Sequence, residues 1–171
     1  MLEKLRQRAI KKHTERTLKS RDTSEINSKL VTLGFLVDEN LMSDFDRLYD
    51  FNKSLELHPK DVKVFSFLEV KKKLPSIRQN QLNNKDFTWR GELQNQSAIE
   101  FLDTPFDVLI GMYQGKNLFM EYLVARSKAH FKVGFEGCDP RLFDLILGVD
   151  PTNLRLVESE LKKYITILKK K

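Results

Sequence analysis

Four apolar segments, separated by stretches with helical spacing of apolar residues, constrain the fold of this chain most strongly. The segments span residues 29–37, 62–70, 106–113 and 131–135. Nearly continuous apolar runs of this length are typical of strands covered on both faces. Helices are expected between and after them, at residues 41–57, 97–102, 117–129 and 151–168. The alternation predicts an α/β fold: a three-layer sandwich with a mostly parallel central sheet, Rossmann-like or flavodoxin-like.

One pair of strands is expected to run antiparallel. Residues 142–149 form another apolar segment, and only a short polar stretch (EGCDPR) separates it from the strand at 131–135. Parallel neighbours usually need a crossover of about a dozen residues or more. The sequence therefore predicts an antiparallel hairpin at one edge of the sheet. Residues 71–96 show no clear periodicity, and a short strand is expected there at 87–90.

The net charge of +6 lies entirely in the first 21 residues. That segment holds two acidic residues and eight basic ones: Lys4, Arg6, Arg8, Lys11, Lys12, Arg16, Lys19 and Arg21. We therefore expect a basic helical arm at 1–21, a polar hinge at 22–28 and a single α/β domain at 29–171. The excess of cations favours an anionic partner. The apolar stripe of the arm (Leu2, Leu5 and Ala9) is narrow, so the arm is expected to bury little of its surface.

A second cationic region mixes basic residues with an aromatic one. Its members are Lys71, Lys72, Lys73, Trp89 and Arg90. RNA-binding proteins use such mixtures to neutralise phosphates and to stack bases. The alternative is a solvated run of charges and a tryptophan packed under its own loop. RNA or the ribosome is the expected partner; an anionic membrane surface is a weaker alternative, because the apolar stripe is slight.

The predicted carboxyl ends of the strands gather a third set of polar residues. In open α/β sheets ligands bind beyond these ends, where this sequence places Asp38, Glu39, Asn40, Lys116 and Asn117. Such a set could hold a metal or a phosphate, which would make the protein an enzyme, or a degenerate enzyme, that binds a nucleotide or sugar phosphate. The alternative is that an Asp or Asn caps the next helix and the lysine is a solvated loop residue. No glycine-rich phosphate loop accompanies the set.

No arrangement of residues in the sequence indicates catalysis. His13, His58 and His130 lie far apart, and none has a nucleophile and a carboxylate spaced as a triad. The single cysteine, Cys138, excludes an intramolecular disulfide and a cysteine-based zinc cluster. A non-enzymatic role without metal or cofactor is therefore favoured. No apolar run approaches the roughly 20 residues of a membrane span, and no secretory signal is recognisable, so we expect a cytoplasmic protein.

Several motifs resemble those of a family of small uncharacterised Bacteroidota proteins that carry a domain of unknown function. The motifs are TWRG (88–91), FDVLIGMY (106–113), LVARSKAHFKVGF (123–135), LFDLILGV (142–149) and VESELKKYITIL (157–168), together with the basic N-terminal helix. The resemblance covers nearly the whole chain. It implies a Rossmann-like or flavodoxin-like fold and transfers no catalytic residue, because the matching positions are mostly strand and core residues.

Overall fold

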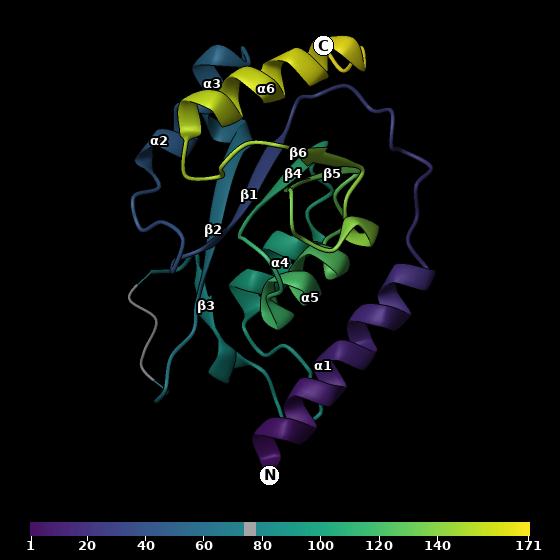
Figure 1. Cartoon of the computed structure of the whole chain (residues 1–171), viewed down its shortest axis with the longest axis vertical. Coiled ribbons are helices and arrows are strands. Elements are labelled where there is room, and N and C mark those ends of the chain that lie inside the picture. Colours follow the sequence, from purple (N-terminus) through teal and green to yellow (C-terminus); the bar gives the residue numbers. More distant parts are fainter. Residues whose placement is uncertain (74–77) are drawn as a thin grey trace.

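The structure, a computed structural model, describes residues 1–73 and 78–171. Its centre is a six-stranded sheet with the order β3-β2-β1-β4-β5-β6 (Figure 1). The strands are β1 (Leu33–Asp38), β2 (Val62–Leu68), β3 (Gln81–Asn83), β4 (Val108–Met112), β5 (Phe131–Phe135) and β6 (Leu145–Leu147). All pairings between these strands are parallel. The order is that of the Rossmann fold, and the predicted α/β sandwich is confirmed.

Helices cover both faces of the sheet. One face carries α4 (Gln96–Asp103) and α5 (Leu118–Arg126); the other carries α2 (Asp46–Tyr49), α3 (Phe51–Ser54) and α6 (Leu154–Ile167). Successive strand residues point to opposite faces, so Leu109 belongs to the α4–α5 core while Val108 and Ile110 belong to the other core. The two apolar cores enclose the sheet and make its strands nearly continuous apolar runs in the sequence.

The single helix expected at 41–57 is two short helices, α2 and α3. The chain first forms a turn, in which the backbone amides of Leu41 and Met42 donate to the carbonyl oxygen of Asp38. The carboxylate of Asp44 then accepts from the amide of Asp46. Side chains of this kind compete with helical hydrogen bonding, and the helical segment therefore begins later and is broken.

The prediction of an antiparallel hairpin at the edge of the sheet is wrong, because β5 and β6 pair in parallel. Gly137, with a φ of +94°, turns the chain after β5, and a 3-10 turn at Pro140–Leu142 packs against α5 on the way back. Strand β6 has only three residues. The return path is therefore about 10 Å at roughly 3.3 Å per residue, and residues 136–144 can cover it without a full crossover helix.

Helix α1 (Leu2–Lys19) lies outside α5 and packs against it (Figure 1). The expectation that the basic segment buries little is wrong, because Ile10 is completely buried within the α4–α5 core. The narrow apolar stripe is not the buried side of the helix, since Leu2 is 64% exposed and Leu5 is 41% exposed. The buried side of α1 is centred instead on Ile10 and Thr14.

The turn after Trp89 fits closely against α1. Gly91 has a φ of +78°, and a Cβ atom there would lie 2.9 Å from the backbone nitrogen of Ile10. Only glycine adopts this conformation readily and lets the helix backbone approach so closely. The glycine of the TWRG motif is thus a docking point for α1.

Candidate functional site

The outer face of α1 concentrates exposed positive charge. Two of the eight cations in residues 1–21 are engaged within the fold: Arg6 pairs with Glu3 at 2.8 Å, and Arg21, just after the helix, pairs with Asp144 at 2.6 Å. The other six are exposed: Lys4, Arg8, Lys11, Lys12, Arg16 and Lys19. At about 100° per residue they fall within an arc of about 140°, opposite the buried Ile10. Glu15 falls within the same arc and pairs with Arg141 at 2.8 Å. The helix therefore presents a predominantly cationic stripe, which we call the α1 stripe.

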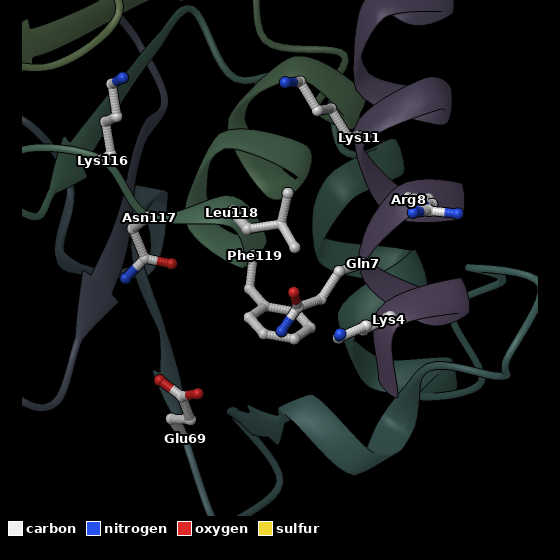
Figure 2. A pocket seen from close by; sticks show the side chains of 9 residues that line it. All are labelled: Lys4, Gln7, Arg8, Lys11, Glu69, Lys116, Asn117, Leu118 and Phe119. Atoms are coloured by element: carbon white, nitrogen blue, oxygen red, sulfur yellow. The ribbon is translucent and has the colours of Figure 1, made fainter. Parts of the chain in front are cut away.

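A cavity of about 540 Å³ lies between α1 and the loop that joins β4 to α5 (Figure 2). We call it the α1–α5 pocket; its lining is Lys4, Gln7, Arg8, Lys11, Glu69, Lys116, Asn117, Leu118 and Phe119. Lys116 reaches it from a turn that Gly115 enables with a φ of +64°. Asn117 caps α5 by accepting from the amide of Met120. The pocket thus joins the arm to the carboxyl edge of the sheet, two regions that were predicted to be separate sites.

The predicted strand-end set is only partly brought together. Asp38 accepts from the side-chain amide of Asn117 at 3.2 Å and from the backbone amide of Asn40 at 3.0 Å. Burial raises the pKa of Asp38. Its carboxylate stabilises a turn after β1 and does not line the α1–α5 pocket, whereas Lys116 and Asn117 do. The expected helix cap at Asp38 or Asn40 is likewise not found, since α2 begins at Asp46.

Glu39 is bound by three protein donors. One carboxylate oxygen accepts from the Ser66 hydroxyl at 2.7 Å, the Arg78 guanidinium at 2.8 Å and the Gln81 amide at 2.7 Å. These donors come from β2, β3 and the segment before β3. Glu39 therefore ties the outer strands to β1, and it is a structural residue in this arrangement.

A second cavity, of about 340 Å³, lies on the other side of α1, against the turn that follows β3. We call it the Trp89 groove; its lining is Leu5, Ala9, Lys12, His13, Arg16, Trp89 and Arg90. Trp89 is 50% exposed, so the alternative of a tryptophan packed under its own loop is wrong. The Arg90 guanidinium lies 4.9 Å from the centre of the indole ring. The backbone of this turn is fixed to α1, since Nε2 of His13 is 3.2 Å from the carbonyl oxygen of Arg90.

The lysine run is separate from both cavities. Lys71, Lys72 and Lys73 are exposed and follow β2, but none of them lines the α1–α5 pocket or the Trp89 groove. Of the second predicted cationic region, the structure brings only Trp89 and Arg90 to α1.

The opposite, amino edge of the sheet holds a cluster that the sequence did not reveal. The Ser28 hydroxyl lies 3.0 Å from both a carboxylate oxygen of Asp107 and Nδ1 of His130. A catalytic triad needs the serine and the carboxylate on different imidazole nitrogens. Here both face the same nitrogen, because Nδ1 is also 3.4 Å from Asp107. The cluster does not have the geometry of a nucleophilic site.

Asp107 instead anchors the chain that enters the sheet. Its carboxylate accepts from the amides of Val31 and Thr32, both at 2.9 Å. Burial alone would raise the pKa of Asp107, but these amides and the hydroxyls of Ser28 and Thr32 outweigh it and hold the pKa below its usual value. The residues of this network lie far apart in the chain and meet only in the folded structure, so the sequence alone could not identify it.

Comparison with known proteins identifies one matching family. A family of unknown function, DUF6913, matches residues 6–168. The chain belongs to this family. None of the curated proteins or solved structures compared with the chain matches it significantly. Within residues 1–73 and 78–171, no helix is both long and apolar enough to cross a membrane, and no three His, Cys, Asp or Glu side chains gather as metal ligands.

Proposed function

We propose that this DUF6913 protein is a non-enzymatic RNA-binding protein of the bacterial cytoplasm. It binds free or ribosomal RNA through the α1 stripe and the Trp89 groove. The observation that carries the proposal is the set of exposed cations on one face of a docked helix beside a half-exposed tryptophan. The cytoplasmic and bacterial assignments follow the resemblance to Bacteroidota proteins and the single, buried Cys138.

The extent of the cationic surface favours a chain of phosphates over a small ligand. Helix α1 has 18 residues and is therefore about 27 Å long at 1.5 Å per residue. Cations line both its sides, in the α1–α5 pocket and in the Trp89 groove. A small anion would occupy one cavity and leave the other empty, whereas a polynucleotide can contact both.

The docking of α1 supports tight binding. Ile10 is buried in the core, and Arg21 at the end of the segment forms two hydrogen bonds with Asp144, at 2.7 and 2.6 Å. The helix that carries the cations of the α1 stripe is therefore held in place before RNA arrives. A preorganised surface loses less conformational entropy on binding than a flexible tail would.

Trp89 provides the contact that distinguishes a nucleic acid from other polyanions. Bases stack on exposed aromatic rings, which contributes about 1–3 kcal/mol per base. Arg90 covers part of the indole, and half of the residue is still accessible. A base stacked there would have its phosphates beside Lys12 and Arg16, which line the same groove.

The fluorescence of Trp89 tests the proposal, because the chain has one tryptophan. Titration with a single-stranded 20-nucleotide RNA carrying a 5′-hydroxyl should quench and saturate this signal, and inorganic polyphosphate should bind without quenching. Trp89→Ala has no such signal, so its affinity is measured by the fluorescence anisotropy of labelled RNA; it should bind RNA at least about fivefold more weakly, the factor that 1 kcal/mol of stacking implies. Tyr49→Ala, at a residue that is 38% exposed on α2, is the matched control.

Two results would overturn the proposal. One is polyphosphate binding as tight as RNA binding with no response of Trp89. The other is saturable binding to anionic phospholipid vesicles by a protein that does not bind RNA.

A further inference from the structure

We infer that the α1–α5 pocket binds a ribonucleoside 5′-phosphate, either a free nucleotide or the 5′-phosphorylated end of an RNA chain. The second of these ligands, an RNA end, rests on the proposed function, because it requires that the protein binds RNA. The argument uses the charge of the pocket, the position of its one carboxylate and its place in the fold.

The pocket has a strong excess of positive charge. Four cations and one carboxylate line it, a net charge of +3. In the part of the chain that the structure describes, none of the four cations is among the ion pairs within 4.0 Å. Arg6 and Arg21, by contrast, already have partners. Phosphate groups, with their multiple negative charges, match such a site better than a single carboxylate would.

The charges are not evenly distributed in the pocket. Figure 2 shows Lys11 and Lys116 at one end, Glu69 at the other, and Lys4 on the α1 side nearer the Glu69 end. Glu69 would repel a phosphate, but its carboxylate can accept hydrogen bonds from sugar hydroxyls. The polarity thus fits a ligand with phosphates at one end and a ribose hydroxyl at the other.

The middle of the pocket suits the rest of a nucleotide. Leu118 and Phe119, from the first turn of α5, lie between the two charged ends (Figure 2). Leu118 is half-buried and offers apolar surface to a sugar or base, whereas Phe119 is only 5% exposed and forms the base of the pocket. The volume of about 540 Å³ falls within the range of roughly 300–1,000 Å³ that is usual for small-molecule sites.

The location agrees with the general rule for open α/β sheets. The central strands β1 and β4 are neighbours, and the chain continues from them to opposite halves of the sheet. Ligands bind at such switch points, beyond the carboxyl ends of the strands. The pocket is at this edge: Lys116 follows β4, and Glu69 directly follows β2.

Calorimetric titration of the full chain with ADP tests the inference. We expect saturable binding that Lys116→Gln weakens at least tenfold. Lys63→Gln, which removes an exposed lysine outside the pocket, should leave it unchanged. ADP should bind about tenfold more tightly than 2′-deoxy-ADP, as expected for a hydrogen bond to a charged group. Glu69→Gln should reduce that preference and strengthen the binding of inorganic diphosphate, because a repulsive charge is removed.

The two sources of the ligand are separated with RNA. If the pocket receives an RNA end, a 5′-phosphorylated 20-mer binds more tightly than its 5′-hydroxyl form. Saturating ADP then lowers the affinity of the phosphorylated RNA to that of the hydroxyl form and no further. If it receives a free nucleotide, ADP binds and the two RNAs bind equally. ADP binding that is the same in Lys116→Gln overturns the inference. So does an absence of ADP binding together with equal binding of the two RNAs, and in that case binding of 5′-hydroxyl RNA still supports the proposed function.

Discussion

The two edges of the sheet differ in how their charged side chains are used. At the amino edge the charges are matched within the fold: Asp107 accepts from two backbone amides, and Arg21 forms a bidentate pair with Asp144. At the carboxyl edge the carboxylates of Asp38 and Glu39 are also bonded within the fold. The lysines of that edge are not: Lys4, Lys11 and Lys116 are exposed around a cavity. A charged group whose partners are supplied by the protein contributes to stability. A cluster of like charges without such partners adds little to stability and is available to a ligand.

The C-terminus shows the same contrast in a single pair of neighbours. Lys170 is buried, and its ammonium group donates to the carbonyl oxygens of Ile26 and Ser28, at 2.6 and 3.3 Å. The adjacent Lys169 is exposed. Lys170 thus ties the segment before β1 to the end of the chain. In the sequence it cannot be told apart from the solvated lysines beside it, but its role is structural.

The largest effect on stability is expected at the amino edge. Asp107→Ala removes the acceptor for the amides of Val31 and Thr32. Leaving such groups unsatisfied should lower the free energy of unfolding by about 2–4 kcal/mol. Chemical denaturation measures this loss. Asp107→Asn keeps one oxygen acceptor and should cost less; equal, small losses in both variants would show that the network is not structural.

Gly91→Ala should loosen the contact between α1 and the domain. The added Cβ atom has an unfavourable positive φ and lies 2.9 Å from the Ile10 nitrogen, so we expect a loss of about 2–3 kcal/mol. Gly137→Ala is the matched control, because it also has a positive φ but nothing within 4 Å of the new atom. Its cost should be only about 1 kcal/mol. If both variants lose the same amount, the close fit at α1 has no energetic weight.

Lys132 predicts a pH dependence of stability at the amino edge. It is 1% exposed and donates to the carbonyl oxygen of Val124 at 2.6 Å; burial lowers its pKa from 10.5 to about 7. Between these values the unfolded chain binds more protons at this site, so stability should rise with pH. The gain should be about 1 kcal/mol between pH 7 and pH 8. Denaturation of wild type and Lys132→Met across this range measures it, and parallel curves would exclude it.

At the carboxyl edge the same experiment should show almost nothing. Lys116→Gln replaces an exposed side chain of the α1–α5 pocket. Its free energy of unfolding should differ from wild type by less than about 0.5 kcal/mol, although ligand affinity falls. A clear loss of stability would mean that Lys116 is a structural residue like Asp107, and the contrast between the two edges would not hold.

Much of the fold could be predicted from the sequence because apolar runs report burial. The strand at Phe131–Phe135 is placed to the residue, β2 and β4 lie within their predicted segments, and β1 extends one residue beyond its segment, to Asp38. The direction of β6 could not be predicted. It depends on a compact return through Pro140–Leu142 and on a strand too short to need a long crossover.

The candidate sites were harder to predict from the sequence, because they depend on contacts between distant parts of the chain. The sequence separated the basic arm from the strand ends, and burial of Ile10 brings them together. Asp38 and Lys116 looked equivalent in the sequence, but Asp38 is bonded to Asn40 and Asn117 whereas Lys116 lines a pocket. A charge count identifies a cationic segment; it cannot say which of its members already have partners.

The salt dependence of RNA affinity tests the central claim most directly. Each phosphate contact on single-stranded RNA contributes a slope of about −0.7 in a plot of log affinity against log salt concentration. With roughly four to six contacts, wild type should show about −3 to −4. Replacing Lys12, Arg16 and Lys19 with Gln should reduce this slope by about 2. The same change at three exposed lysines away from α1 (Lys60, Lys63 and Lys162) should leave it unchanged. Equal slopes in the two triple variants would contradict the assignment of the α1 stripe as an RNA-binding surface.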